Sequence, residues 1–188
     1  MRHQKIKLLD ITKKTLILGS AEGDLALNSL RCTVLMASKV VEISMEGIQG
    51  VDACFVRNSI ASFSKIFCKT VGIIVSNIEN IDVLDNLVYG MKAKSVYLLI
   101  KNKDGSISFY SDLTSSLEPI VSFVYTKSEV TTSQVAKQFG LSTPNVSAKL
   151  KKLHTAGLLH AVRQDAATGG MEYIFSPLMK CSNISFHS

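Results

Sequence analysis

The stretch VTTSQVAKQFGLSTPNVSAKLKKLHTAGLLHAVR, residues 130–163, decides the fold of the second half of the chain. It predicts a short helix, a tight turn, a longer helix and then a strand. Thr131 and Gln134 have the spacing of a capping box, in which each side chain bonds the backbone N–H of the other residue. Gly140 ends the first helix because glycine tolerates a positive φ angle. Two helices joined by so short a turn form a helix-turn-helix.

The second helix of this stretch carries its own start, face and stop signals. Ser142 is a good N-cap, and Pro144 is tolerated in the first turn, where the N–H groups have no helical partner. An inward apolar stripe at i, i+4 and i+7 consists of Val146, Leu150 and Leu153. Gly157 ends the helix. The face opposite the apolar stripe is then free to contact a partner.

A strand, a polar tip and a returning strand are predicted after the second helix. Residues 158–163 and 171–175 are β-prone, and the polar segment 164–170 lies between them. With the capping Thr, the Phe-Gly-Leu-Ser turn and the Leu-Lys-Lys-Leu helix, this order resembles the winged helix-turn-helix of MarR- and ArsR-type bacterial regulators. The resemblance covers roughly a third of the chain and implies binding to double-stranded DNA. The alternative is a winged helix that binds protein.

In the DNA-binding hypothesis, a recognition helix reads bases with the residues opposite its buried stripe. Asn145 can donate to and accept from adenine, whereas lysines suit phosphates, which position the protein without specifying sequence. The wing tip 164–170 carries no Lys or Arg, which argues against insertion into the minor groove. The candidate DNA-binding residues are Thr132, Ser133, Thr143, Pro144, Asn145, Ser147, Ala148, Lys149, Lys151, Lys152 and Arg163.

Strand and helix patterns alternate in the first half of the chain. Residues 5–11, 15–18, 40–45, 71–75, 96–100 and 107–110 are strand-like, and Asp52 and Asn80 are plausible N-caps of amphipathic helices. This predicts an α/β (α+β) fold with a small mixed sheet covered by helices. The polar segment 112–116 is the best boundary, with Ser116 capping the next helix. We expect domains at 1–114 and 115–179 and a loose or partner-bound tail at 180–188.

The core of the first half supports a second resemblance. Residues 40–65, VVEISMEGIQGVDACFVRNSIASFSK, place a strand, an acidic-Gly turn and a helix with an embedded Phe in the order of the STAS-like family of bacterial domains of unknown function. Residues 71–88 fit as well, so the resemblance covers about 14–100. Related anti-sigma-factor antagonists carry a phosphorylatable Ser in Asp-Ser-Ser-Gly, but here the run is Asp52-Ala53-Cys54-Phe55. The resemblance implies interaction or sensing without a phosphoserine switch at that place.

Composition and cysteine spacing indicate the kind of partner, the cellular compartment and the state of the cysteines. Of 188 residues, 46% are hydrophobic and 19% charged, and the net charge of +6 suits a polyanionic partner. We expect a cytoplasmic protein, because no signal peptide and no apolar run long enough for a membrane span is seen. Cysteines at non-metal spacings are expected to be buried reduced thiols, namely Cys32, Cys54, Cys68 and Cys181.

Catalytic chemistry is not expected from this sequence. Two of the four histidines lie near the termini, and His154 and His160 belong to the winged half, with His154 facing solvent or phosphate. The loop 19–23 lacks a phosphate-binding fingerprint. It can meet the loop 46–50 at one end of the sheet, where the candidate carboxylates are Glu22, Asp24, Glu46 and Asp52. We predict no enzyme activity, no catalytic residue, no metal and no cofactor.

These observations combine into one hypothesis with one main alternative. The chain is expected to be a homodimeric transcriptional regulator, more often a repressor, that binds an inverted-repeat operator on double-stranded DNA. Its N-terminal domain would dimerise or receive a protein or small-molecule signal. The alternative is a STAS-like partner-switch protein whose winged helix binds protein rather than DNA.

Overall fold

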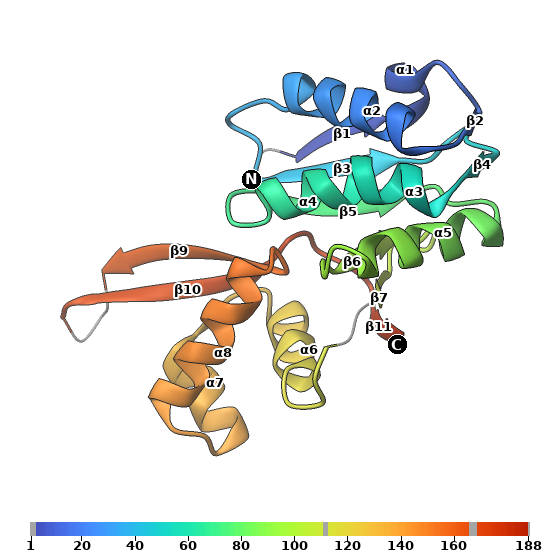
Figure 1. Ribbon diagram of the computed structural model, residues 1–188. Coiled ribbons are helices and arrows are strands. Elements are labelled where there is room, and N and C mark those ends of the chain that lie inside the picture. The colour runs from blue at the N-terminus through green and yellow to red at the C-terminus, as the bar shows by residue number, and fades with distance from the viewer. Residues whose placement is uncertain (1–2, 111–112, 166–168, 188) are drawn as a thin grey trace.

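The computed structural model describes residues 3–110, 113–165 and 169–187 of the chain. Figure 1 shows an α/β half above a winged half, with the long β9–β10 hairpin projecting to one side. The predicted α/β class with a mixed sheet is confirmed. Within the described residues, no helix is long and apolar enough to cross a membrane.

The α/β half alternates strands and helices, as the sequence pattern predicts. Asp52 and Asn80 cap their helices as expected: the Asp52 carboxylate accepts from the N–H of Phe55 at 2.7 Å, and the Asn80 side chain accepts from that of Asp82 at 2.9 Å. The elements are β1 (His3–Lys7), α1 (Leu8–Thr12), β2 (Leu16–Ile17), α2 (Ser20–Thr33), β3 (Val40–Ser44), β4 (Gly50–Val51), α3 (Ala53–Val56), the π-helical turn η1 (Arg57–Ala61), α4 (Ser62–Phe67), β5 (Gly72–Ser76), α5 (Ile81–Lys92), β6 (Leu98–Lys101) and β7 (Ile107–Tyr110).

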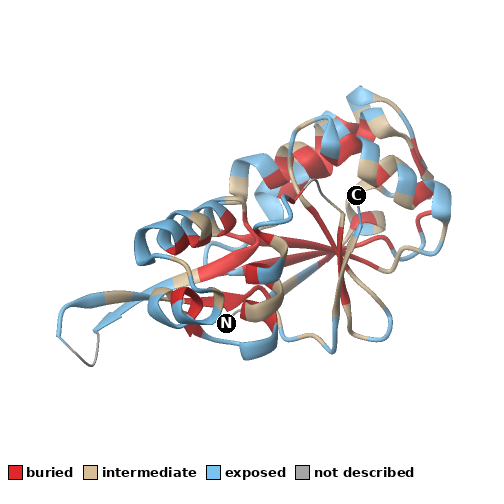
Figure 2. Ribbon diagram, turned by 90° about the horizontal axis from the view of Figure 1, so that it is seen from below, coloured by how far each residue is buried: buried red, intermediate tan, exposed pale blue. Residues whose placement is uncertain are grey.

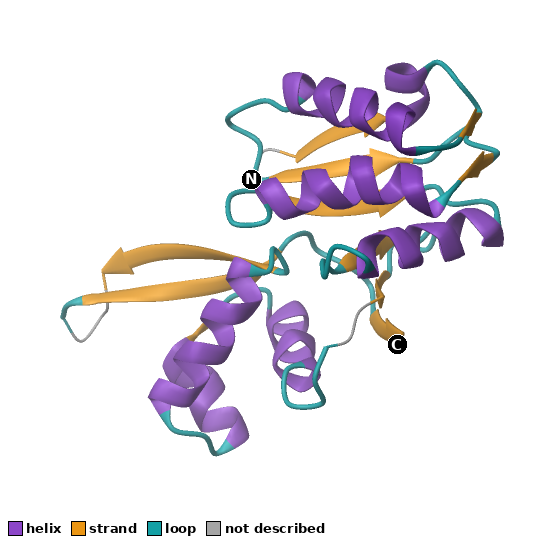
Figure 3. Cartoon of the chain, viewed as in Figure 1, coloured by secondary structure: helices purple, strands orange, loops and turns teal. Residues whose placement is uncertain are grey.

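One face of the main sheet is covered by helices. The strand order is β1-β3-β5-β6-β7-β11, and each of the parallel strands β1, β3, β5 and β6 lies beside the one before it. Right-handed crossovers that step in one direction leave their helices on one face. Leu30 of α2, Phe63 of α4 and Leu87 of α5 accordingly share a core with Val41 and Ile43 of β3. Figure 3 shows these helices, in purple, running alongside the strands of the sheet, in orange. The expectation of helix cover is confirmed for this face.

The winged half contains the predicted helix-turn-helix and wing. Its three-stranded sheet has the order β8-β10-β9, and Figure 3 shows the β9–β10 hairpin extending beyond the helices. The tip residues 166–168 lie outside the described residues, so it stays a prediction that this tip, which lacks Lys and Arg, does not insert into the minor groove. The elements are α6 (Glu118–Lys127), β8 (Val130–Thr131), α7 (Thr132–Phe139), α8 (Thr143–Thr155), β9 (Leu159–Asp165) and β10 (Met171–Pro177).

The two halves share a hydrophobic core on the second face of the sheet. Ile74, Leu99 and Phe109 pack with Val121 and Leu178 of the winged half. Gly72 of β5 leaves space for the Leu178 side chain, where a Cβ atom would collide with it. Figure 2 shows buried residues, in red, running from the sheet into the adjoining helices. The winged half is therefore packed on the sheet rather than tethered by a linker.

The expectation of a tail without regular structure at 180–188 is wrong for its last residues. Ile184–His187 form β11, which pairs in parallel with β7 and completes the six-stranded sheet. The ring of Phe186 stacks on that of Phe109 with centroids 5.1 Å apart. The chain thus returns to the α/β half after the wing. The last strand belongs to the sheet of the first half, although it follows the winged half in the sequence.

Three local predictions also need correction. The strand expected at residues 5–11 is β1 followed by the short helix α1, which ends at Lys13 in a left-handed conformation. The helix expected to start near Asp24 begins at Ser20. Ser116 does not cap α6, whose N-cap position is Leu117 and has no side-chain hydrogen bond. Of the predicted boundary 112–116, residue 112 lies outside the described part.

Candidate nucleic-acid interface

The helix-turn-helix starts with the predicted capping box. The Thr131 hydroxyl accepts from the N–H of Gln134 at 3.1 Å, and the Gln134 side chain accepts from the N–H of Thr131 at 2.8 Å. Gly140 takes a left-handed conformation at φ +63° and ends α7. The candidates at the start of α7 differ in access, because Ser133 is exposed and Thr132 is half-buried. These local hydrogen bonds therefore fix the start of α7, the first helix of the helix-turn-helix.

Helix α8 buries the predicted stripe and exposes the predicted recognition face. Val146, Leu150 and Leu153 are fully buried. Ser142 occupies the N-cap position, but its side chain makes no capping hydrogen bond, so this part of the prediction is wrong. The N–H groups of the first turn remain available to an anion. The exposed candidates on α8 are Thr143, Pro144, Asn145, Ser147, Ala148, Lys151 and Lys152.

Two further candidates have distinct surroundings. Lys149 is half-buried, and its Nζ donates to Ser116 Oγ at 2.9 Å. This bond ties α8 to the segment that precedes α6, so Lys149 has a structural contact that the sequence did not indicate. Arg163 is exposed on β9 opposite Tyr173 of β10. Arg163 therefore lies on the wing, separate from the α8 surface.

The exposed face of α8 divides into two parts. Asn145 and the rest of the first turn lie at the end of α8 that points away from the α/β half (Figure 1). Ala148, Lys151 and Lys152 instead line a cleft that α8 forms with α4 and the nearby strands. Sequence periodicity identified the outward face but could not show this cleft, because its opposite wall comes from residues about 80 positions earlier.

The two histidines of the winged half are structural in their contacts. His154 was expected to face solvent or phosphate, but it is half-buried and its Nδ1 lies 2.9 Å from the Leu159 carbonyl oxygen across the turn into β9. His160 is buried at 9% exposure, and no hydrogen-bond partner for its Nε2 is found among the described residues. Burial, with smaller contributions from His154 and Lys39, lowers the pKa of His160 to about 4.

This burial predicts an acid-sensitive fold. Since an unfolded chain binds the His160 proton with a pKa near 6.5 and the native chain with one near 4, stability should fall as the pH drops from 6.5 to 4. At pH 5 the loss attributable to His160 should be about 2 kcal/mol relative to pH 7.5. Urea unfolding of the wild type and of His160→Leu at both pH values measures it. An equal loss in the variant would exclude His160 as the cause.

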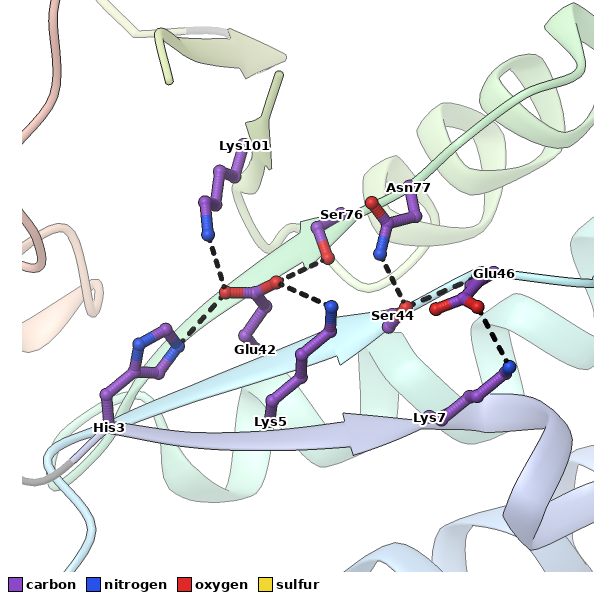
Figure 4. Close-up of polar contacts among 9 residues, drawn as sticks. All are labelled: His3, Lys5, Lys7, Glu42, Ser44, Glu46, Ser76, Asn77 and Lys101. Carbon is purple, nitrogen blue, oxygen red and sulfur yellow. Dashed lines mark hydrogen bonds and ion pairs between the residues drawn. The ribbon is translucent and has the colours of Figure 1, made fainter. Parts of the chain in front are cut away.

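A second polar cluster lies on the sheet face opposite the helices. Glu42 of β3 is 2% exposed and bonds three side chains: Ser76 Oγ at 2.7 Å, Lys101 Nζ at 3.2 Å and His3 Nε2 at 3.1 Å (Figure 4). Lys5 Nζ lies 3.8 Å away. Burial acts to raise the pKa of Glu42, but the bonds from Ser76 and Lys101 and the nearby charges hold it below its usual value. The strand pattern alone did not reveal this network.

Removing the Glu42 charge should destabilise the sheet. Glu42→Gln leaves the Lys101 ammonium without its buried counter-charge, and we expect a loss of about 2 kcal/mol in unfolding free energy. The matched control is Glu46→Gln, because Glu46 pairs with Lys7 at 3.1 Å in a much more exposed setting. That change should cost less than about 1 kcal/mol. Chemical denaturation compares them, and equal losses would contradict the argument.

Each of the candidate carboxylates Glu22, Asp24, Glu46 and Asp52 bonds a different partner in the fold. The expected loop 19–23 is the start of α2 from Ser20 onward. The Asp52 carboxylate, at the N-cap of α3, accepts from the N–H of Gly19 at 2.9 Å, so the starts of α2 and α3 lie together at one end of the sheet. Glu22 pairs with Lys14 at 2.6 Å, and Asp24 accepts from Asn58 at 3.2 Å. These contacts join α2 to the start of α3, to η1 and to the chain before β2, and none of them pairs two of these acids.

The cysteines only partly follow the prediction. All four are free thiols, but Cys32 and Cys54 are exposed rather than buried, and Cys68 and Cys181 are half-buried. Burial raises the pKa of the Cys181 thiol. In the part of the chain that the structure describes, no three His, Cys, Asp or Glu side chains are grouped as metal ligands would be.

Comparisons with known proteins point to the winged half. Residues 120–161 match the family of bacterial regulatory proteins, arsR family, so an arsR-type helix-turn-helix runs from α6 to the start of β9. The match covers less than a quarter of the chain and leaves the STAS-like resemblance of the first half an untested prediction. A solved structure described as a possible transcriptional regulator from Methanosarcina mazei Go1 has a TM-score of 0.32 and 24% identity. That likeness covers 35% of this chain and 57% of that one. Comparison with curated proteins found no match.

Proposed function

We propose that this chain is a DNA-binding transcriptional regulator whose recognition element is α8. The observation that carries the proposal is the exposed face of α8, opposite a fully buried stripe, in a helix-turn-helix of the arsR type. In this arrangement Asn145 contacts a base in the major groove, and Lys151 and Lys152 contact phosphates. Ser133 at the start of α7 and Arg163 on the wing supply further phosphate contacts.

The regulator acts as a homodimer in this proposal. A single module of this size makes few phosphate contacts, so two copies related by a two-fold axis would double them and read an inverted repeat. The α/β half, with exposed apolar side chains such as Leu16, Leu18 and Leu25, offers surface for self-association. Repression follows if the operator overlaps a promoter, and the α/β half then receives the signal.

Selection from genomic DNA tests this proposal directly. The full chain should retain a small set of fragments from its own genome that share an inverted repeat. Analytical ultracentrifugation should show a dimer on a fragment that carries both half-sites. Retention of fragments without any common sequence would contradict sequence-specific regulation, and retention of protein partners but no DNA would favour the partner-switch alternative.

A further inference from the structure

The cleft between the two halves has the size of a small-ligand site. Its volume is about 740 Å³, within the range typical of pockets that hold organic molecules. One wall is the second half of α8, with Lys151 and Lys152. The other is the end of α4 and the turn after it, with Lys65 and Lys69. The cleft is therefore built by both halves of the protein.

The charges around this cleft all have one sign. Lys65, Lys69, Lys151 and Lys152 line it, and no Asp or Glu is found among its described lining residues. Lys65 Nζ donates to the carbonyl oxygen of Lys94 at 3.2 Å, which leaves its charge uncompensated. Among the described residues, none of these four lysines forms an ion pair. Four ammonium groups around one opening attract an anion.

The inner surface of the cleft is apolar. Val71, Ile73 and Leu99, each at most 9% exposed, are among its lining residues. Ser64 also lines it, and its buried hydroxyl has no hydrogen-bond partner among the described residues. That hydroxyl has almost no accessible surface, so it offers no hydrogen-bonding group to the cleft. A phosphodiester backbone would not fill an apolar floor, whereas the apolar body of a small organic acid would.

We infer that this cleft binds a small organic anion, with its apolar body against Val71, Ile73 and Leu99 and its carboxylate, sulfonate or phosphate among the four lysines. The regulatory part of this inference rests on the proposed function. Lys151 and Lys152 cannot pair with the ligand and with DNA phosphates at once. Ligand and DNA therefore compete, and by linkage each lowers the affinity of the other by the same factor.

Binding of anilinonaphthalene sulfonate, a fluorescent aromatic anion, tests the site without DNA. The wild-type chain should bind one molecule per chain saturably. The double variant Lys65→Gln/Lys69→Gln should bind it at least tenfold more weakly, because two of four charges are lost. The matched control is Lys13→Gln/Lys103→Gln, which removes the same charge from exposed positions outside the cleft and should bind as the wild type does. The uncharged N-phenylnaphthylamine should bind more weakly than the sulfonate.

The outcomes separate the site from its regulatory role. Equal sulfonate binding by the wild type and by Lys65→Gln/Lys69→Gln overturns the inference. The inference is also overturned if Lys65→Gln/Lys69→Gln keeps sulfonate binding but loses affinity for duplex DNA. The cleft would then be a path for the DNA backbone. If the sulfonate binds as expected while the chain binds no DNA at all, the ligand site stands and the proposed function falls. Single Lys69→Gln, with an intermediate loss expected, repeats the test with a smaller change.

Discussion

Phe109→Ala is expected to lower the free energy of unfolding by about 3–5 kcal/mol, the usual cost of removing a large aromatic side chain from a core. Phe109 is fully buried in β7 and joins three parts of the molecule. Its ring lies 5.4 Å from that of Tyr125 in α6, edge to face, and 5.1 Å from that of Phe186 in β11. The substitution therefore removes the aromatic contacts that β7 makes with α6 and with β11.

Urea denaturation followed by circular dichroism measures this loss. Tyr89→Ala in α5 is the control, because Tyr89 is 68% exposed and its removal should change stability by less than about 0.5 kcal/mol. Since the core around Phe109 is shared, both halves of the wild type should unfold in one transition. A loss below about 1 kcal/mol, or two separate transitions in the wild type, would contradict a shared core.

The double variant Lys151→Gln/Lys152→Gln should bind duplex DNA at least about tenfold more weakly than the wild type, whatever its sequence. Each lysine that neutralises a phosphate contributes close to one unit to the slope of log K against log salt. The slope should therefore become shallower by about 2 per subunit. Both side chains are exposed on α8, so the folded structure should be preserved. Fluorescence anisotropy at several salt concentrations measures affinity and slope together.

A charge-matched control distinguishes a local contact from a general electrostatic effect. Lys13→Gln/Lys103→Gln has the same net charge as the α8 double variant but changes residues in the α/β half. It should keep the wild-type slope. If both double variants shift affinity and slope equally, DNA would be responding to the overall charge of the protein, and the assignment of α8 would be wrong.

The helix-turn-helix could be predicted from the sequence because its signals are local. The capping pair Thr131 and Gln134, the left-handed Gly140 and the stripe from Val146 to Leu153 each act within one helical turn or two. Such short-range hydrogen bonds and periodicities are set before any tertiary contact forms. The same reasoning correctly placed the caps Asp52 and Asn80 of the α/β half.

The features that the sequence did not reveal all depend on distant residues. Ile184–His187 is only four residues long, and its pairing with β7 joins positions 77 apart. Glu42 lies in a strand that reads as apolar, and its partners come from β1, β5 and β6. The lysine-lined cleft combines α4 with α8. Propensity and spacing cannot predict these contacts, because they form only when strands and helices far apart in the sequence pack together.

The central claim, that α8 reads DNA, is tested most directly by Asn145→Ala on the operator recovered from genomic selection. Asn145 is exposed in the first turn of α8, where a recognition helix contacts base edges. Binding is measured against a panel of duplexes that vary one base pair at a time. The account predicts that the variant loses preference at one position of each half-site, by about 1–3 kcal/mol, and keeps the wild-type salt slope. An unchanged preference at every position would contradict it.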